Sequence, residues 1–228
     1  MEEEHKPNTL EDNSYCFKSL STDELEFLSL NKTQITYLKG ETVFKQGAFA
    51  PHVLFVHSGL VRVYLQTNPN KQVNIRLAKQ GDFIAFSSIF DVNIYQYSGS
   101  ALKESVVCML DKEALKQVLL RNPEFALRIT SRNCKLESRY LDIINNVTYK
   151  QMRGKLASAI LYLASDDFKD ENVFQYLTRQ DIADFASITI ESAIKFLKEF
   201  ESEAIISLDG KNIEVQDQKR LVDISTKG

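Results

Sequence analysis

The fold is decided by the stretch "LTRQDIADFASITIESAIKFLKEFESEAIISLDGKNIEV", residues 177–215. Thr178 stands three residues before Asp181, which is the spacing of a capping box at the start of a helix. A break at Ser187 ends that short helix, and Thr189 is placed to cap a second one. Two short apolar runs follow, and the Asp-Gly pair between them is typical of a hairpin turn. The sequence therefore predicts a helix, a turn, a second helix and a hairpin.

The second helix has two distinct faces. Its predicted inward stripe has helical spacing and consists of Ala193, Phe196, Leu197, Phe200 and Ala204. Its predicted outward residues are Ile190, Glu191, Ile194, Lys195 and Lys198. In a helix-turn-helix, the N-terminal residues of the second helix meet base edges in the major groove, where a carboxylate accepts from a cytosine amino group. Glu191 is therefore predicted to read a base, although its position also suits the helix dipole alone.

The composition is that of an ordinary globular protein, with 228 residues, 43% hydrophobic and 26% charged. The formal net charge of -3 excludes a general electrostatic attraction to nucleic acid, so any DNA binding depends on local geometry. No run approaches the roughly 20 apolar residues of a membrane span. The first residues are acidic, unlike the basic start of a signal peptide. We expect a cytoplasmic protein without membrane contact.

The residues that commonly carry catalysis or bind metals do not cluster. The three cysteines are far apart and odd in number, which argues against a disulfide framework or a metal site. An enzyme built on a metal-binding β-roll needs grouped ligands, and the three histidines form no regular motif with carboxylates. No catalytic residue, metal ion or cofactor is therefore predicted.

Four segments differ in character along the chain. Residues 1–14 are predicted to be a loosely attached tail. Residues 15–122 are β-rich, with short runs punctuated by glycines and with flanking helices. Residues 123–147 read as one long helix, and residues 148–228 contain the helix-turn-helix. The predicted fold class is α+β.

The long helix carries a coiled-coil pattern. Seven residues are separated by alternating steps of three and four, which is the spacing of a and d positions. Asn133 falls at an a position, where an amide can pair with its twin across a parallel dimer. The alternative is that the stripe packs on the β-rich half of its own chain. The seven residues are Ala126, Ile129, Asn133, Leu136, Tyr140, Ile143 and Val147.

This order of parts resembles the CRP/FNR family of bacterial transcription regulators. The stretch "LKGETVFKQGAFAPHVLFVHSGLVRVY" is similar to the opening of the family's β-roll, and "KQGDFIAFSSIF" to the segment leading into its phosphate-binding cassette. Residues 177–215 are similar to its DNA-binding signature and wing. The resemblance implies an N-terminal antiparallel β-roll of jelly-roll type, a long dimerisation helix and a C-terminal winged helix-turn-helix. It also implies a homodimer on a palindromic DNA site.

The resemblance assigns DNA contacts as well. Glu191 and Lys195 occupy the family's base-reading glutamate and arginine positions, and the lysine keeps the charge but loses the bidentate fork. Ile190 stands where some members have arginine and others valine. Further contacts to phosphates or bases are expected from Arg179, Gln180, Thr189, Ser192 and the wing residue Lys211.

The effector pocket departs from the family pattern. Cyclic-nucleotide-binding members have a Gly-Glu pair where this chain has Ala85 and Phe86, and no Arg or Lys occurs from Ile89 to Leu102. Because a buried phosphate without a cation is poorly compensated, cyclic AMP is not expected as the effector. We expect an unknown small-molecule effector or none. The candidate pocket residues are Phe86, Ser98, Gly99, Ser100 and Tyr140.

The predicted function is sequence-specific regulation of transcription. The expected partners are double-stranded DNA and a second copy of the chain, and RNA polymerase is a further candidate. The rival interpretation is a ligand-binding or scaffolding protein of the same fold that has lost DNA binding. Acidic residues outnumber basic ones from Thr178 to Lys211, which keeps this rival open.

Overall fold

The computed structural model describes residues 17–68, 71–90 and 93–227. The predicted tail, residues 1–14, lies outside these ranges, as does Cys16. The chain forms two compact units, one with residues up to 63 and 77–137, the other with residues 64–76 and 138 onward. The long helix α3, Pro123–Tyr149, contributes to both, and it begins at residue 123, as predicted.

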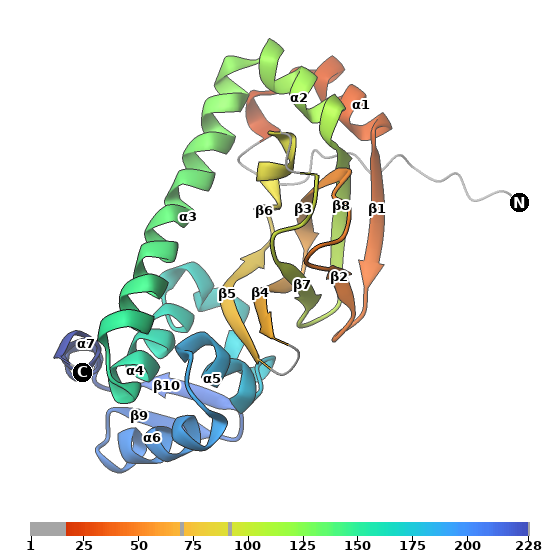
Figure 1. Cartoon of the computed structure of the whole chain (residues 1–228). Helices are drawn as coiled ribbons and strands as arrows, with labels where there is room; N and C mark the ends of the chain where they lie inside the picture. The colour runs from red at the N-terminus through yellow and green to blue at the C-terminus, as the bar shows by residue number, and fades with distance from the viewer. Residues whose placement is uncertain (1–16, 69–70, 91–92, 228) are drawn as a thin grey trace, which may run out of the picture. The chain divides into compact units, whose positions relative to one another are not determined.

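The first unit is built on two four-stranded sheets, ordered β1-β8-β3-β6 and β2-β7-β4-β5 (Figure 1). Strand β8 pairs antiparallel with both β1 and β3, which confirms the predicted antiparallel β-roll. Residues 64–76, which include the end of β4 and the beginning of β5, belong to the second unit. The strands are β1 (Lys32–Tyr37), β2 (Thr42–Phe44), β3 (His52–Ser58), β4 (Leu60–Asn68), β5 (Lys71–Lys79), β6 (Phe83–Ile84), β7 (Ser98–Ala101) and β8 (Ser105–Asp111).

Strand β3 has apolar side chains on both faces, and each face packs in a different core. Because side chains alternate between the faces of a strand, neighbouring residues enter different cores. Leu54 and Val56 lie in a cluster that contains residues of both sheets. Val53 and Phe55 lie in a second cluster with the short helix η1 (Phe17–Ser19), the helices α1 (Thr22–Leu30) and α2 (Lys112–Arg121) and the start of α3. Both faces of β3 are therefore covered.

One residue of the predicted dimer seam belongs to that second cluster. Ile129 is 0% exposed within its own chain, so it has no surface left for a partner. The seam assignment is wrong for Ile129, and for this residue the alternative of packing on its own β-roll holds. Asn133 is half-buried, and its Nδ2 donates to the carbonyl of Ile129 at 3.0 Å.

The exposed apolar residues of α3 lie on an adjacent face. Leu127, Cys134 and Leu141 are exposed and follow each other at intervals of seven residues. Ile144, Tyr140 and Val147 are exposed too, whereas the seam candidates Ala126, Leu136 and Ile143 are half-buried. The exposed stripe of α3 is defined as Leu127, Cys134, Tyr140, Leu141, Ile144 and Val147.

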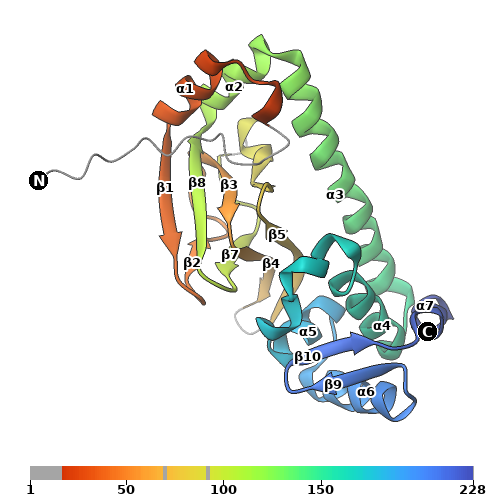
Figure 2. The same ribbon diagram turned by 180° about the vertical axis from the view of Figure 1, so that it is seen from behind.

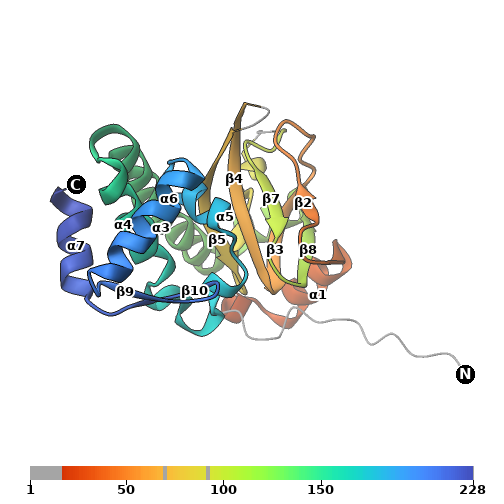
Figure 3. The ribbon, with the colours of Figure 1, turned by 90° about the horizontal axis from the view of Figure 1, so that it is seen from below.

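The second unit contains the predicted helix-turn-helix and hairpin, and the β9–β10 hairpin lies beside α6 (Figure 2). The largest buried side chains of this unit include those of Leu156, Ile160, Leu163 and Phe200, each at most 1% exposed. Helix α7 was not predicted, and it packs against α4 (Figure 3). The elements are α4 (Met152–Leu163), η3 (Asp166–Glu171), η4 (Val173–Gln175), α5 (Arg179–Ala186), α6 (Ile190–Ser202), β9 (Ile206–Asp209), β10 (Asn212–Val215) and α7 (Gln218–Lys227).

Two details of the second unit correct the predictions. Helix α6 ends at Ser202, so Ala204 is exposed beyond the helix, at a φ of 55°, and does not belong to the inward stripe. In the hairpin, Asp209 pairs with Asn212, so Gly210 and Lys211 form its loop.

Within the described ranges, no helix is both long enough and apolar enough to cross a membrane.

Candidate nucleic-acid interface

The helix-turn-helix is set by two caps and one special backbone conformation. The Thr178 hydroxyl accepts from the backbone N–H of Asp181 at 3.1 Å, and the Asp181 carboxylate accepts from the backbone N–H of Thr178 at 2.8 Å. Ser187 ends α5 at a φ of 54°, a left-handed conformation that turns the chain sharply. The Thr189 hydroxyl then accepts from the Ser192 backbone N–H at 3.3 Å and caps α6. The predicted capping box, break and cap are confirmed.

Helix α6 divides into a buried and an exposed face. Ala193, Leu197 and Phe200 are at most 2% exposed. Glu191, Ile194, Lys195 and Lys198 are exposed, while Ile190 and Ser192 are half-buried. The structure thus brings the predicted base-reading residues together at the beginning of one helix.

Glu191 carries an ionised carboxylate at neutral pH, as an ordinary glutamate does. Its own backbone N–H, and then the Thr189 hydroxyl, lower the pKa of its carboxyl group below the ordinary value. An ionised carboxylate accepts hydrogen bonds and donates none. At the start of α6 this group therefore matches a donor such as the cytosine amino group.

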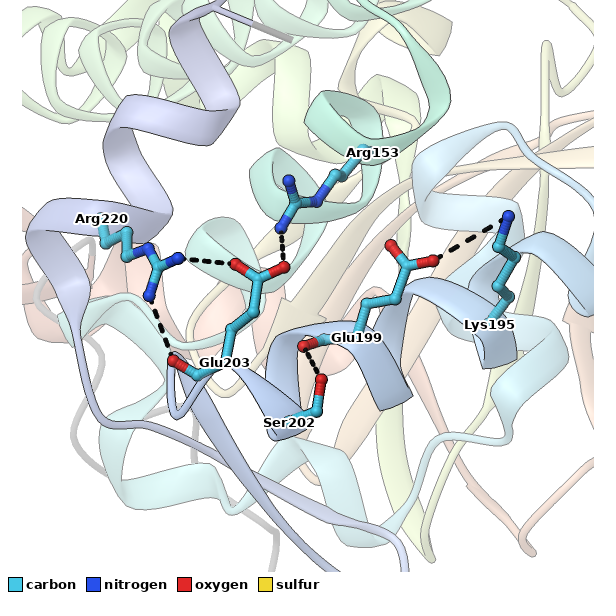
Figure 4. Close-up of polar contacts among 6 residues, drawn as sticks. All are labelled: Arg153, Lys195, Glu199, Ser202, Glu203 and Arg220. Carbon is cyan, nitrogen blue, oxygen red and sulfur yellow. Dashed lines mark hydrogen bonds and ion pairs between the residues drawn. The ribbon is translucent and has the colours of Figure 1, made fainter.

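Lys195 lies one turn further along the same face. Its Nζ is 3.9 Å from the Glu199 carboxylate, and the lysine side chain is 69% exposed (Figure 4). An exposed pair at this spacing contributes only about 0.3–0.5 kcal/mol. The lysine can therefore exchange this partner for guanine or a phosphate at little cost.

Arg179 binds the wing in this structure. Its Nη2 donates to the carbonyl of Gly210 at 2.8 Å, and its Nη1 donates to the carbonyl of Lys211 at 3.3 Å. Burial lowers the pKa of the guanidinium, and the Glu201 charge opposes this shift. The residue predicted to touch phosphate thus ties the start of α5 to the β9–β10 turn, a role that sequence spacing did not indicate.

Gln180 also has a partner within the second unit. Its Nε2 donates to Asp184 Oδ1 at 2.8 Å, and Asp184 Oδ2 accepts from Gln72 Nε2 at 2.6 Å. Asp184 is buried, and so is Asp181. These two acidic residues of α5 are therefore turned into the protein, where hydrogen bonds compensate their charge.

Glu203 was missed by sequence reasoning, and it anchors the end of α6. One carboxylate oxygen accepts from Arg153 of α4 at 2.5 Å, and the other accepts from Arg220 of α7 at 2.8 Å (Figure 4). Arg220 also donates to the Glu203 carbonyl at 3.1 Å. Three helices therefore meet at one carboxylate, and the only sequence signal was a glutamate at a helix end.

The predicted effector residues are divided between the two units, with Tyr140 in the second and the others in the first. Phe86 packs on the cluster of Phe55 and Phe83 and does not enter the cluster between the sheets, which corrects its expected place. Tyr140 is exposed on α3. In the β-roll, Ser98 Oγ accepts from the Gln46 backbone N–H at 2.9 Å. The Ser98 hydroxyl therefore acts as an acceptor at this position.

Strand β4 supplies a cation that the sequence argument did not consider. Arg62 Nε donates to Ser100 Oγ at 3.3 Å. Gly99 lies directly against the Phe44 ring, since a Cβ atom built on Gly99 would overlap that ring. Phe44 in turn packs on the buried ring of Tyr95, with 5.0 Å between centroids. The interior beside β7 is therefore lined by aromatic rings and one guanidinium.

Among the described residues, no group of three or more histidine, cysteine, aspartate or glutamate side chains is arranged to hold a metal ion.

Comparisons with known proteins match both halves of the chain. Residues 34–122 match the cyclic nucleotide-binding domain, and residues 154–224 match the Crp-like helix-turn-helix domain. Together these domains define a DNA-binding transcription regulator. The chain belongs to the CRP/FNR family.

Relatives of this kind cover nearly the whole chain. The CRP-like cAMP-activated global transcriptional regulator of Mycobacterium tuberculosis is 24% identical over 213 residues, covering 90% of this chain and 93% of the relative. The anaerobic regulatory protein of Bacillus subtilis is 23% identical, covering 83% and 82%. Among solved structures, FixK2 from Bradyrhizobium japonicum shares the fold with a TM-score of 0.74 at 17% identity, covering 86% and 98%.

Proposed function

We propose that this protein is a cytoplasmic, homodimeric regulator that reads a palindromic DNA site through α6 and has no enzymatic activity. The observation that carries the proposal is the exposed start of α6, where Glu191 and Lys195 stand one turn apart on a helix whose other face is buried. A carboxylate followed by a cation matches the hydrogen-bonding groups of C·G pairs in the major groove. RNA polymerase is proposed as a further partner.

The distribution of acidic residues supports DNA binding over the scaffolding rival. Seven acidic residues lie between Thr178 and Lys211. Asp181 and Asp184 are buried, and Glu203 pairs with Arg153 and Arg220. Three of the seven acidic residues are thus compensated inside the domain, which reduces the repulsion that an approaching phosphate backbone would meet.

The homodimer is proposed from the exposed stripe of α3. An apolar stripe with a seven-residue repeat is stable when it is covered by a second helix. A two-fold dimer presents two copies of α6, and these fit half-sites whose centres lie about 34–36 Å apart, one turn of DNA.

Selection of bound duplexes from a random pool by the purified protein tests the proposal. We expect an inverted repeat whose half-site includes a C·G pair. A variant with both Glu191→Ala and Lys195→Ala is the control, and it should fold but lose the enrichment. A pool without any enriched sequence would support the scaffolding rival.

A further inference from the structure

The reading face of α6 holds one apolar side chain among polar ones. Ile194 leaves 39% of its surface exposed. The exposed residues of this helix are Glu191, Ile194, Lys195, Lys198, Glu201 and Ser202. A large apolar side chain on the polar face of an amphipathic helix gains nothing from water, so a partner that covers it would stabilise the complex.

Ile194 continues a row that starts with Ile190. Residues four apart are neighbours on a helix surface, so these two side chains lie along one row. Glu191 and Lys195 form the row beside it, and Lys198 follows Ile194. The start of α6 therefore offers an apolar strip next to a polar strip, both on the face assigned to DNA.

The apolar strip is held rigidly. Isoleucine is β-branched and keeps one strongly preferred χ1 rotamer in a helix. The cap at Thr189 and the burial of Ala193 and Leu197 fix the helix beneath these side chains. A contact made by Ile194 therefore loses little side-chain entropy when DNA binds.

The 5-methyl group of thymine is the apolar group that bases present in the major groove. We propose that Ile194 is a specificity-determining residue that selects a thymine in each half-site by contact with this methyl group. The inference rests on the proposed function, because it names a base that the same helix selects. Lys195 and Lys198, which lie near Ile194 on the exposed face, attract the phosphate backbone, and the thymine methyl group gives Ile194 an apolar contact.

The spacing on the helix limits where this thymine lies. Side chains three residues apart, such as Glu191 and Ile194, are separated by about 5–6 Å. Successive base pairs are separated by about 3.4 Å. The thymine is therefore expected within about two base pairs of the pair that Glu191 contacts.

Replacement of thymine by deoxyuridine removes only the methyl group and tests the contact directly. Each thymine of the selected site is replaced in turn, and the affinity of the full-length protein is measured. At one position near the Glu191 pair, uracil should weaken binding about fourfold per half-site, the factor that corresponds to burial of one CH₂-sized group. Ile194→Ala should bind both duplexes equally there, and Ile194→Val should keep part of the thymine preference.

Val222 offers a matched control. It is 40% exposed on α7, close to the exposure of Ile194, but it lies outside the reading helix. Val222→Ala should keep the full preference for thymine. Alanine favours a helix more than isoleucine or valine does, so both alanine variants should fold, and their thermal unfolding verifies this.

The outcomes separate the inference from the proposed function. If Ile194→Ala retains the preference for thymine over uracil, the inference is overturned. The same holds if the protein selects a defined site in which no thymine depends on its methyl group. If the wild-type protein selects no sequence at all, the proposed function fails and the inference fails with it.

Discussion

At the scale of single residues, Glu191 is proposed to give an acidic protein its specificity for a polyanion. Its carboxylate is ionised at neutral pH, and its own backbone N–H and the Thr189 hydroxyl lower its pKa further. In the proposed complex, the charge would repel phosphates wherever the helix is out of register, and only a facing base donor would satisfy it. The residue would therefore favour correct sites by penalising wrong ones.

Glu191→Ala should relax the preference for one base pair in each half-site. Loss of a good base contact lowers discrimination by about 1–3 kcal/mol, whereas binding to unrelated DNA should become tighter because a negative charge is removed. Competition binding with all four base pairs at each position measures this. Asp223→Ala on α7 removes the same charge and should leave the preference intact. An unchanged preference in Glu191→Ala would reduce Glu191 to a helix-capping charge.

Arg179 and Lys211 should act on DNA as one unit. Because the Arg179 guanidinium holds the carbonyls of Gly210 and Lys211, its loss should release the wing and with it the Lys211 contact. Each phosphate contact contributes about 0.9 to the salt slope of binding. We expect each single alanine variant, and the double variant, to lower the slope by about 0.9. A double variant that lowers it by about 1.8 would show that both residues touch phosphate independently.

At the scale of secondary-structure elements, α6 is fixed at both ends by different means. A threonine caps its beginning, and Glu203 at its end binds Arg153 of α4 and Arg220 of α7. The direction of α6 therefore depends in part on α7, through the contact between Arg220 and Glu203.

Glu203→Gln should weaken this anchor. A neutral amide accepts less strongly from two guanidinium groups, and for a partly exposed cluster the loss of stability is expected to be about 1–2 kcal/mol. Thermal unfolding should show a midpoint lower by about 2–8 °C for the whole chain. Asp223→Asn, an equal charge change on the exposed surface of α7, should leave the midpoint in place. Equal midpoints for both variants would show that Glu203 is not an anchor.

The β-roll carries a prediction about its ligand. Cyclic AMP should not bind at micromolar concentration, because Phe44 covers Gly99 and Phe86 stands where cyclic-nucleotide-binding members have a glutamate. Calorimetry with the purified protein measures this. Micromolar binding that Arg62→Ala abolishes would contradict the prediction and show that the guanidinium of β4 serves the phosphate.

The parts of the fold that the sequence predicts are those with local signals. The capping box at Thr178 and the cap at Thr189 depend on residues three apart, and both are confirmed. The contact of Arg62 with Ser100 joins residues 38 positions apart, and the contact of Arg179 with Gly210 joins residues 31 positions apart. No local sequence pattern predicts contacts of this separation. Ile129 was misassigned because a heptad pattern shows that a stripe is buried but not by which partner.

At the scale of the whole molecule, the exposed stripe of α3 is the surface through which we propose that two chains assemble. Leu141 and Ile144 are 67% and 60% exposed, a large apolar surface for a helix in water. Leu141→Asp together with Ile144→Asp should give a monomer at micromolar concentration in sedimentation, and the affinity for the palindrome should fall with it. Leu30→Asp, at a residue 78% exposed outside α3, should leave the dimer unchanged. A stable dimer of the double variant would place the interface elsewhere.

Cys134 lies in this stripe, where it could form a disulfide between two chains. It shares the heptad position of Leu127 and Leu141, and it is an exposed free thiol. In a parallel two-fold pair of helices, equivalent core residues face each other, so the two thiols would meet at the centre of the interface. Mild oxidation should therefore join two chains through a single disulfide, seen as a doubled mass that reductant reverses and that Cys134→Ser abolishes. Such a disulfide would show directly that the two α3 helices pair in parallel with Cys134 opposite Cys134.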